Sequence, residues 1–227
     1  MQKKVLTPTN VLLALAYMLF IITFSVVVVL HFRPLYYSEI DRLQIQESSG
    51  LSNEKIRENY NSLIRYNSMF NYDELEFPDL PMSEEGKIHF EEVKDIFVVV
   101  QYTCILMFFM IVLGTSWKSY LKDCGYLKIA SIVTIVIPLI LGILIALNWE
   151  TFFVTFHHIF FRNDYWIFDP AKDPIITLLP DAFFMHCAMA ILGLVVFGSV
   201  VCYGAFSLLH RRWDKAETCP KANNAFD

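Results

Sequence analysis

The segment LKIASIVTIVIPLILGILIALNW, residues 127–149, defines the class of fold to which this chain belongs. Lys128 is its only charged side chain. The segment is long enough for the hydrocarbon core of a bilayer, which an α-helix crosses with about 20 mostly apolar residues. Pro138 lies in the middle of the run, so we expect a kink there. The segment predicts a transmembrane helix.

Three further segments have the same apolar character. Among the 227 residues, 56% are hydrophobic and 18% are charged, whereas a soluble domain carries about a quarter charged residues. The first segment is too long for a signal peptide and no small-residue cleavage site follows it, so we expect a retained helix. We therefore predict an all-α integral membrane protein with four transmembrane helices. The further three are residues 11–32 (VLLALAYMLFIITFSVVVVLHF), 96–117 (IFVVVQYTCILMFFMIVLGTSW) and 181–209 (DAFFMHCAMAILGLVVFGSVVCYGAFSLL).

Basic residues gather at three places that fall on one side of this arrangement. Lysine and arginine favour the cytoplasmic side of a membrane. Both termini are therefore expected in the cytoplasm, and residues 33–95 and 150–180 are expected outside. The basic residues are Lys3, Lys4, Lys118, Lys122, Lys128, Arg211, Arg212 and Lys215.

The larger outer segment has the pattern of a small folded cap between the first two helices. LSNEKIRENYNSLIRYNSMF, residues 51–70, has apolar residues at helical spacing, and Ser52 is a suitable N-cap. FPDLPMSEEGKIHF, residues 77–90, is expected to be extended and rich in turns. The predicted segments are 1–32 (N-terminus and first helix), 33–95 (extracellular cap), 96–117 (second helix), 118–126 (cytoplasmic loop), 127–149 (third helix), 150–180 (aromatic-rich outer segment), 181–209 (fourth helix) and 210–227 (cytoplasmic tail).

Several functions are disfavoured by composition and by missing motifs. The net charge of −5 argues against nucleic-acid binding, because no basic face is available to neutralise phosphates. There is no HExxH, no His-x-His and no paired cysteine, so we expect no metal site. A GxSxG elbow and a Gly-rich phosphate loop are also missing. The five cysteines are expected to be small core residues and are Cys104, Cys124, Cys187, Cys202 and Cys219.

Three of the six histidines have ordinary explanations. His31 and His210 end the first and fourth apolar segments, where histidine is commonly an interfacial residue. His186 lies one turn into the fourth segment and is expected to hydrogen-bond to a neighbouring helix.

The other three histidines lie where the chain is expected to leave the membrane. His157 and His158 are adjacent, so on a helix they point about 100° apart and cannot share one target. His89 precedes the second span and is placed to meet this pair at the boundary between cap and membrane. Two interpretations stay open, namely satisfied interfacial histidines and a pair of acid–base groups that titrate near neutrality.

The segment TFFVTFHHIFFRNDYWIFDP, residues 151–170, combines aromatic and ionisable side chains. Its rings are typical of an interfacial belt, but so many in one segment favour a surface for lipid chains. Arg162 is suited to bind a phosphate or carbonyl, or to reach anionic lipid. Asp164 is suited to orient an imidazole or to cap a turn. The candidate substrate-binding residues are Phe156, Phe160, Phe161, Arg162, Asn163, Asp164, Tyr165 and Trp166.

Two motifs give the chain a family resemblance. SEEGKIHFEEVKDIF and FHHIFFRNDYWIFDPAKDPIITLLPDAFF, with four spans and a cap between the first two, resemble the bacterial lipoprotein intramolecular transacylases, Lit. The resemblance implies transfer of the sn-2 acyl chain of a diacylglyceryl-lipoprotein to the α-amino group of its N-terminal cysteine. It implies that His89 and His157 are catalytic and that His158 is a variable neighbour. It also implies a multi-pass protein of a bacterial plasma membrane, with the site at the extracellular face.

The implied reaction fits these residue types. Attack of the amine on the ester closes an eight-membered ring, so the site must hold a bent substrate. We assign His157 as the base and His89 as the acid, with the reverse assignment left open. Oxyanion donors are expected from Arg162, Asn163 or Trp166. The supporting candidates are His158, Asp95 and His186. The transfer is downhill and needs no metal or other cofactor, and its partners are the lipid-linked lipoprotein and membrane lipid.

Two other functions remain open from the sequence. A non-enzymatic lipid-binding scaffold, or the partner subunit of a transporter, would explain the aromatic segment and the cap without chemistry. A lipid-directed ester hydrolase would use water in place of the amine. Convergence of the histidines separates the first alternative from an enzyme, and the product separates the second.

Overall fold

The computed structural model describes residues 5–218, and in that part of the chain the secondary structure is entirely helical. Lys3 and Lys4, which contribute to the predicted orientation, lie outside the described residues, as does Cys219.

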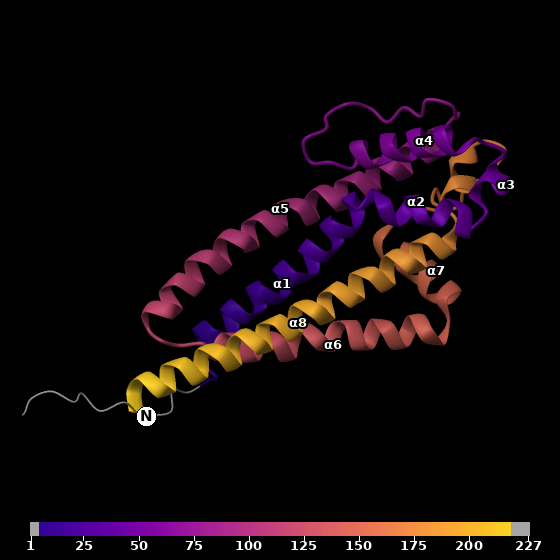
Figure 1. Ribbon diagram of the computed structural model, residues 1–227. Coiled ribbons are helices and arrows are strands. Elements are labelled where there is room, and N and C mark those ends of the chain that lie inside the picture. The colour runs from indigo at the N-terminus through magenta and orange to yellow at the C-terminus, as the bar shows by residue number, and fades with distance from the viewer. Residues whose placement is uncertain (1–4, 219–227) are drawn as a thin grey trace, which may run out of the picture.

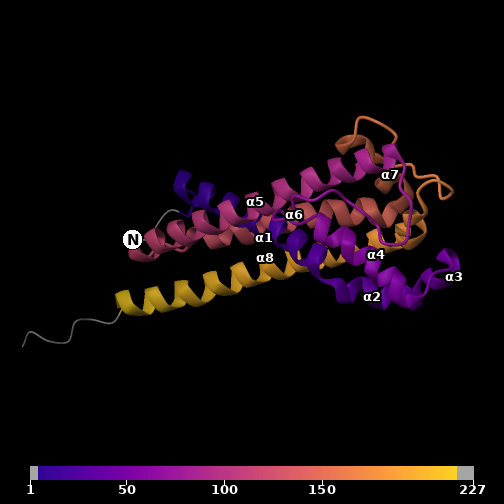
Figure 2. The ribbon, with the colours of Figure 1, turned by 90° about the horizontal axis from the view of Figure 1, so that it is seen from above.

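Four long helices form the body of the molecule. They are α1 (Pro8–His31), α5 (Glu84–Tyr120), α6 (Gly125–Leu147) and α8 (Asp181–Thr218). Each contains a stretch that is long and apolar enough to cross a membrane. Figures 1 and 2 show the four running side by side, with α1 packed against α5, α6 and α8. The predicted number of spans is confirmed.

The helices of the bundle approach one another closely where glycines face large side chains. A Cβ atom at Gly114 of α5 would lie 2.5 Å from Leu13 Cδ1 of α1. A Cβ atom at Gly198 of α8 would lie 2.6 Å from Ile21 Cγ2 of the same helix α1. Small residues at such crossings let the backbones approach closely. Inside a bilayer this van der Waals packing is a main cause of helix association, because the hydrophobic effect is missing there.

Short helices gather at one end of the bundle, as Figure 1 shows. They are α2 (Arg33–Arg42), α3 (Ile45–Ser49), α4 (Asn53–Tyr66), α7 (Trp149–Phe160) and the 3₁₀ helix η1 (Pro174–Leu178). We call α2, α3, α4 and η1 the end cap.

The end cap has its own apolar core. Tyr36 of α2 stacks on Tyr60 of α4 with ring centroids 3.7 Å apart. The Tyr36 hydroxyl donates to the carbonyl of Leu178 in η1 at 2.8 Å, so this buried ring leaves no polar atom unpaired. Helix α4 begins where the sequence predicts, because the Ser52 hydroxyl accepts the Lys55 N–H as an N-cap. The end cap is thus a packed unit in which η1, just before α8 in the chain, is bonded to α2.

One segment departs from its expected conformation. Residues 77–90 were expected to be extended, but α5 begins at Glu84, so the prediction is wrong for their second half. The Ser83 hydroxyl accepts the Gly86 N–H, and Glu84 and Glu85 in the first turn suit the positive end of the helix dipole. As a result His89 and the apolar stretch after it belong to one helix of 37 residues.

The aromatic segment also contains more helix than the motif suggested. Helix α6 runs continuously through Pro138 to Leu147. The Asn148 side chain then accepts the Thr151 N–H and starts α7 in a new direction. Helix α7 ends at Phe160, and His157 lies in its last turn.

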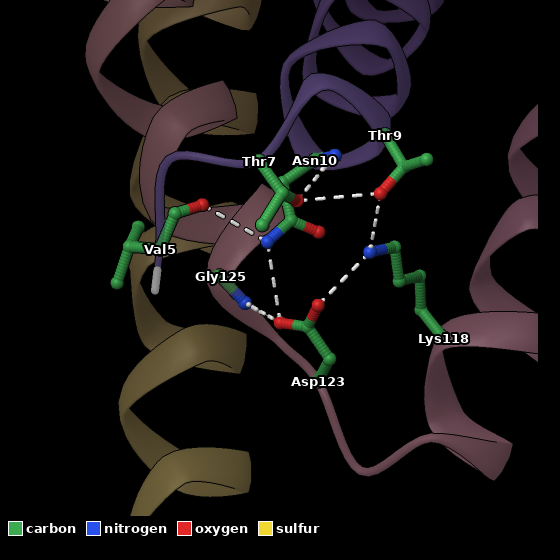
Figure 3. A network of polar contacts seen from close by, with 7 residues as sticks. All are labelled: Val5, Thr7, Thr9, Asn10, Lys118, Asp123 and Gly125. Atoms are coloured by element: carbon green, nitrogen blue, oxygen red, sulfur yellow. Dashed lines mark hydrogen bonds and ion pairs between the residues drawn. The ribbon is translucent and has the colours of Figure 1, made fainter. Parts of the chain in front are cut away.

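A polar network ties the opposite end of the bundle together (Figure 3). Lys118 Nζ lies 2.9 Å from Asp123 Oδ2 and 2.9 Å from Thr9 Oγ1. Asp123 Oδ1 accepts from the Gly125 N–H and from Asn10 Nδ2. Lys118 is only 3% exposed, because its ammonium bonds to both partners inside this network. The network joins the start of α1 to the loop between α5 and α6.

Candidate active site

Two histidines from distant parts of the sequence lie together beside the end cap. His89 is in the second turn of α5, and His157 is in the last turn of α7. Their ring centroids are 6.4 Å apart. Phe161 packs against both rings, at 4.7 Å from His89 and 5.7 Å from His157 between centroids. The histidine pair is therefore part of one aromatic cluster.

The beginning of α5 is fixed by the segment that follows the aromatic motif. Asp173 accepts from the Ser83 N–H at 2.7 Å and from the Ser83 hydroxyl at 2.6 Å. A Cβ atom at Gly86 would lie 2.5 Å from Asp173 Oδ1, so glycine lets the two segments meet. Three residues later on the same helix, His89 meets Phe168 of this segment, with ring centroids 5.4 Å apart. Asp173 is a structural link in this arrangement.

His157 has one ring nitrogen committed to the backbone. Its Nδ1 lies 2.7 Å from the carbonyl oxygen of Phe153. A carbonyl can only accept, so Nδ1 carries the proton and Nε2 of the neutral ring is left with its lone pair. Trp166 stacks on the imidazole with centroids 4.6 Å apart. Burial lowers the pKa of His157 below its ordinary value and outweighs the opposite effect of the Phe153 carbonyl.

His89 is the more enclosed of the two. It is 6% exposed and is surrounded by the rings of Phe90, Phe161 and Phe168. Its Nδ1 is buried and has no hydrogen-bond partner among the described residues. Burial of this kind favours the neutral imidazole. His89 thus holds a buried polar atom for which the described chain supplies no hydrogen bond.

Three more buried polar atoms in this region have no partner within the described chain. They are Trp166 Nε1, Glu92 Oε2 and, at the start of α7, Trp149 Nε1. The second carboxylate oxygen of Glu92 accepts from Asn163 Nδ2 at 2.9 Å. Most buried polar groups in proteins are hydrogen-bonded, so several unpaired ones in a single cluster indicate a place for a polar ligand.

Glu92 was missed by the sequence reasoning, although a signal for it was present. It follows His89 by three residues, which on a helix places both side chains on the same face. The motif contains two neighbouring glutamates, and only contacts from α7 and beyond distinguish Glu92 from the exposed Glu91.

The predicted substrate-binding residues divide into three groups. Phe161, Asn163 and Trp166 belong to the cluster, since they contact the histidines or Glu92. Phe156 meets His157 edge-on, Phe160 lies tilted against Phe156, and these two rings are 42% and 50% exposed. The side chains of the remaining three are exposed, and these residues are Arg162, Asp164 and Tyr165.

The three supporting candidates lie apart from the histidine pair or at its margin. His158 is exposed and touches the edge of Trp166, with centroids 5.5 Å apart. Asp95 is exposed and follows His89 by six residues, about 240° further round the helix. His186 is occupied elsewhere, because its Nδ1 lies 3.0 Å from Oε2 of the buried Glu39 in α2. We do not assign these three to the cluster.

The donor set of this region is suited to proton transfer. Across residues 5–218, no group of three or more His, Cys, Asp or Glu side chains is placed to hold a metal ion. A neutral imidazole with a free Nε2, a second buried imidazole and a carboxylate lie within one cluster. Such groups accept, donate and orient protons, and the exposed rings beside them offer apolar surface.

The four apolar helices define a multi-pass membrane protein. Comparison with known proteins then identifies the family. Residues 11–184 match the family model described as lipoprotein intramolecular transacylase Lit. The chain therefore belongs to the Lit family and is an acyltransferase, and the resemblance given by its two motifs is confirmed.

Solved structures agree with this assignment. The membrane-integral lipoprotein intramolecular transacylase Lit from Bacillus cereus is 38% identical, with a TM-score of 0.89 over 91% of this chain and 96% of that chain. A variant of the same protein with one histidine changed to arginine gives 0.84, over 92% and 93%. A variant with a histidine changed to alanine gives 0.83, over 91% and 94%. No curated protein sequence matches the chain significantly.

Proposed function

We propose that this chain moves the sn-2 acyl chain of a diacylglyceryl-lipoprotein to the α-amine of its N-terminal cysteine. The observation that carries the proposal is the pair of imidazoles, His89 and His157, with ring centroids 6.4 Å apart inside an aromatic cluster. Membership of the Lit family supports the substrate class. The product would be a lyso-form lipoprotein that is N-acylated and keeps one chain on its glycerol.

His157 is the proposed base. The nucleophile is an α-amine whose unperturbed pKa is about 7.7–8.0, so near neutrality it arrives mostly protonated. His157 Nε2 is available because Nδ1 is held by the Phe153 carbonyl. Burial lowers the pKa of His157, which keeps the ring neutral and ready to accept. One proton passes from the ammonium to Nε2, and the freed nitrogen lone pair attacks the ester carbonyl carbon.

His89 is the proposed acid. In the tetrahedral intermediate the C–O bond to the glyceryl oxygen breaks. The neutral His89 ring gives its N–H proton to that oxygen and takes up the second proton of the nitrogen, so it ends neutral, and His157 later releases the first proton to water. The buried Nδ1 of His89 has no partner among the described residues, so the ring is free to serve a substrate oxygen. Trp166 is the favoured oxyanion donor, because its Nε1 is also unpaired there, whereas Asn163 Nδ2 already donates to Glu92.

The aromatic rings are proposed to hold the substrate in the bent conformation that the reaction needs. Attack closes an eight-membered ring of atoms from the amine nitrogen to the ester carbon, which a free chain rarely adopts. Correct positioning contributes up to about 7–11 kcal/mol in ideal intramolecular reactions. Phe156 and Phe160 expose apolar surface beside His157 and are the proposed supports for the acyl chains.

The proposed orientation puts the end cap and the histidine pair at the extracellular face of a bacterial plasma membrane. The described basic residues at the other end of the bundle support it, since lysine and arginine favour the cytoplasm. Both termini would then lie inside. These basic residues are Lys118, Lys122, Lys128, Arg211, Arg212 and Lys215.

Mass spectrometry of a synthetic diacyl lipopeptide incubated with the purified full-length protein tests the function. Acyl transfer leaves the total mass unchanged and moves one chain to the cysteine nitrogen, which fragmentation locates. Release of free fatty acid with an unmodified amine would instead identify an ester hydrolase. An unaltered lipopeptide under conditions in which the protein stays folded would contradict both reactions.

A further inference from the structure

Glu92 has a position that the proposed mechanism does not yet use. It lies one turn after His89 on α5, and its Oε1 accepts from Asn163 Nδ2 at 2.9 Å. Its Oε2 is enclosed by protein and has no hydrogen-bond partner in the part of the chain that the structure describes. None of the ion pairs found within residues 5–218 includes Glu92. The carboxylate is thus half satisfied and lacks a cationic partner.

A buried carboxylate oxygen without a donor is unfavourable, because the desolvation of the charge is not compensated. An unpaired carboxylate oxygen of this kind is tolerated in the folded protein when a bound ligand supplies the missing donor. The complementary ligand is a cation with N–H donors, since an ionised carboxylate only accepts hydrogen bonds.

The surrounding contacts hold Glu92 in place beside the imidazoles. Asn163 Oδ1 accepts the Tyr165 N–H at 3.1 Å, which fixes the amide that bonds to Glu92. The same short segment carries Phe161 and Trp166, the rings that pack on His89 and His157. Glu92 therefore belongs to the same cluster as the proposed acid and base.

We propose that Glu92 binds the protonated α-amine of the lipoprotein substrate, with Oε2 accepting an ammonium N–H. This inference rests on the proposed function, because it assigns the recognition of that substrate's amine. The ammonium donates a hydrogen bond to Glu92 and stays protonated until His157 Nε2 takes one of its protons. The N–H groups that remain continue to hold the nitrogen at the carboxylate. Asn163 is a positioning residue that acts through Glu92.

The proposal distinguishes two substrates that differ only in the amine. Calorimetry would measure the affinity of the full-length protein for two ligands. The first is a lipopeptide whose two lipid chains are attached to the glyceryl group by ether links instead of esters, so that no transfer occurs. The second ligand carries 3-mercaptopropionyl in place of cysteine and so lacks the amine. A charge-assisted hydrogen bond predicts that the wild type binds the first ligand at least about tenfold more tightly.

Glu92→Gln should remove that preference and leave the affinity for the ligand without an amine unchanged. Glu91→Gln is the matched control, because Glu91 is the neighbouring exposed residue, and it should keep the wild-type ratio. A Glu92→Gln protein that retains the preference would overturn the proposal, and so would equal loss of both ligands, which would mean a purely structural role.

The test is separate from that of the proposed function. The ether ligands cannot react, so the amine preference is measured whether or not transfer takes place. Failure of the wild type to convert the ester lipopeptide would sink the transferase proposal alone. A wild type that converts the ester lipopeptide but shows no preference for the amine would sink only the role of Glu92.

Discussion

The two ends of the bundle treat buried polar groups in opposite ways. At the end drawn in Figure 3, Lys118 and Asp123 are each bonded to more than one partner, and Asn10 Oδ1 is the atom of that network left unpaired. Beside the end cap, His89 Nδ1, Trp166 Nε1 and Glu92 Oε2 are all enclosed without a partner in residues 5–218.

The contrast separates structural polarity from functional polarity. A network that satisfies its own members stabilises one arrangement of helices and has little left to offer a ligand. A cluster whose members are unpaired is less favourable on its own and offers hydrogen-bonding positions to a polar ligand. Substitutions at the first end should therefore change stability, and those at the second should change catalysis.

The largest effect is expected from removing either imidazole. His89→Ala and His157→Ala should each lower the rate of N-acyl product formation by about 10²–10⁴-fold, the range for loss of a general acid or base. His89→Ala also leaves a cavity beside Phe161 and Phe168, so the rates are compared per folded molecule. Product formation measured by mass spectrometry checks this.

The neighbouring His158 provides the control for this comparison. It is exposed and contacts Trp166 only at its edge, so His158→Ala should retain measurable turnover. Wild-type rates in both of the first two variants would remove the histidine pair from the mechanism.

A large effect on stability is expected at the other end. Lys118→Met keeps the aliphatic stem but leaves Asp123 without its cation, and breaking a buried pair in this way costs about 3–5 kcal/mol. Chemical or thermal unfolding in detergent measures the change. Turnover per folded molecule should stay near the wild-type value. Lys128→Met, at an exposed position, should cost less than about 1 kcal/mol, and equal destabilisation by the two variants would contradict the distinction.

A smaller effect on both properties is expected from Gly86→Ala. The new Cβ would lie 2.5 Å from Asp173 Oδ1 and 3.0 Å from its Cγ, so one of the two segments has to move. Overpacking of this kind costs about 1–3 kcal/mol, and it should also lower turnover by shifting His89 against Phe168. Gly193→Ala is the matched control, because nothing lies within 4 Å of its added Cβ, and alanine should there stabilise α8 by about 0.5–1 kcal/mol.

The smallest effect concerns pH. The pKa of His157 is lowered by burial, so the ring stays neutral as the pH falls below the ordinary value of 6.5, and its basic function is lost only when the pH falls through the lowered pKa. The acidic limb of kcat should therefore lie below pH 6.5. Trp166→Ala uncovers the ring and should move that limb upward, toward the ordinary value. A wild-type limb above 6.5 would show that another group controls the rate.

The sequence was sufficient for features that are local or repeated. Runs such as residues 127–149 are apolar along a whole helix, so composition alone predicted the four spans. Ser52 was predicted as a cap because an N-cap depends on residues within one turn. His89 and His157 were proposed through a family resemblance, which joins distant motifs that local patterns cannot join.

Features that depend on long-range contacts were missed. Asp173 stabilises the start of α5 through Ser83, 90 positions earlier in the chain, and no local pattern announces that bond. Lys118 was predicted as a charge of a cytoplasmic loop, yet its side chain is buried in a network with α1. Glu92 differs from the neighbouring Glu91 because it accepts a hydrogen bond from Asn163, 71 residues further along the chain.

Because α5 is unbroken, it sets a fixed distance between His89 and the apolar part of the helix. The predicted apolar part of this helix begins at Ile96, seven residues after His89, and a rise of about 1.5 Å per residue places the imidazole roughly 10 Å beyond that boundary. Since α5 has no break between the two points, the height of His89 relative to the bilayer would be fixed. A lipid ester is anchored at a similar depth by its own tails, so enzyme and substrate would be brought to the same level by the membrane itself.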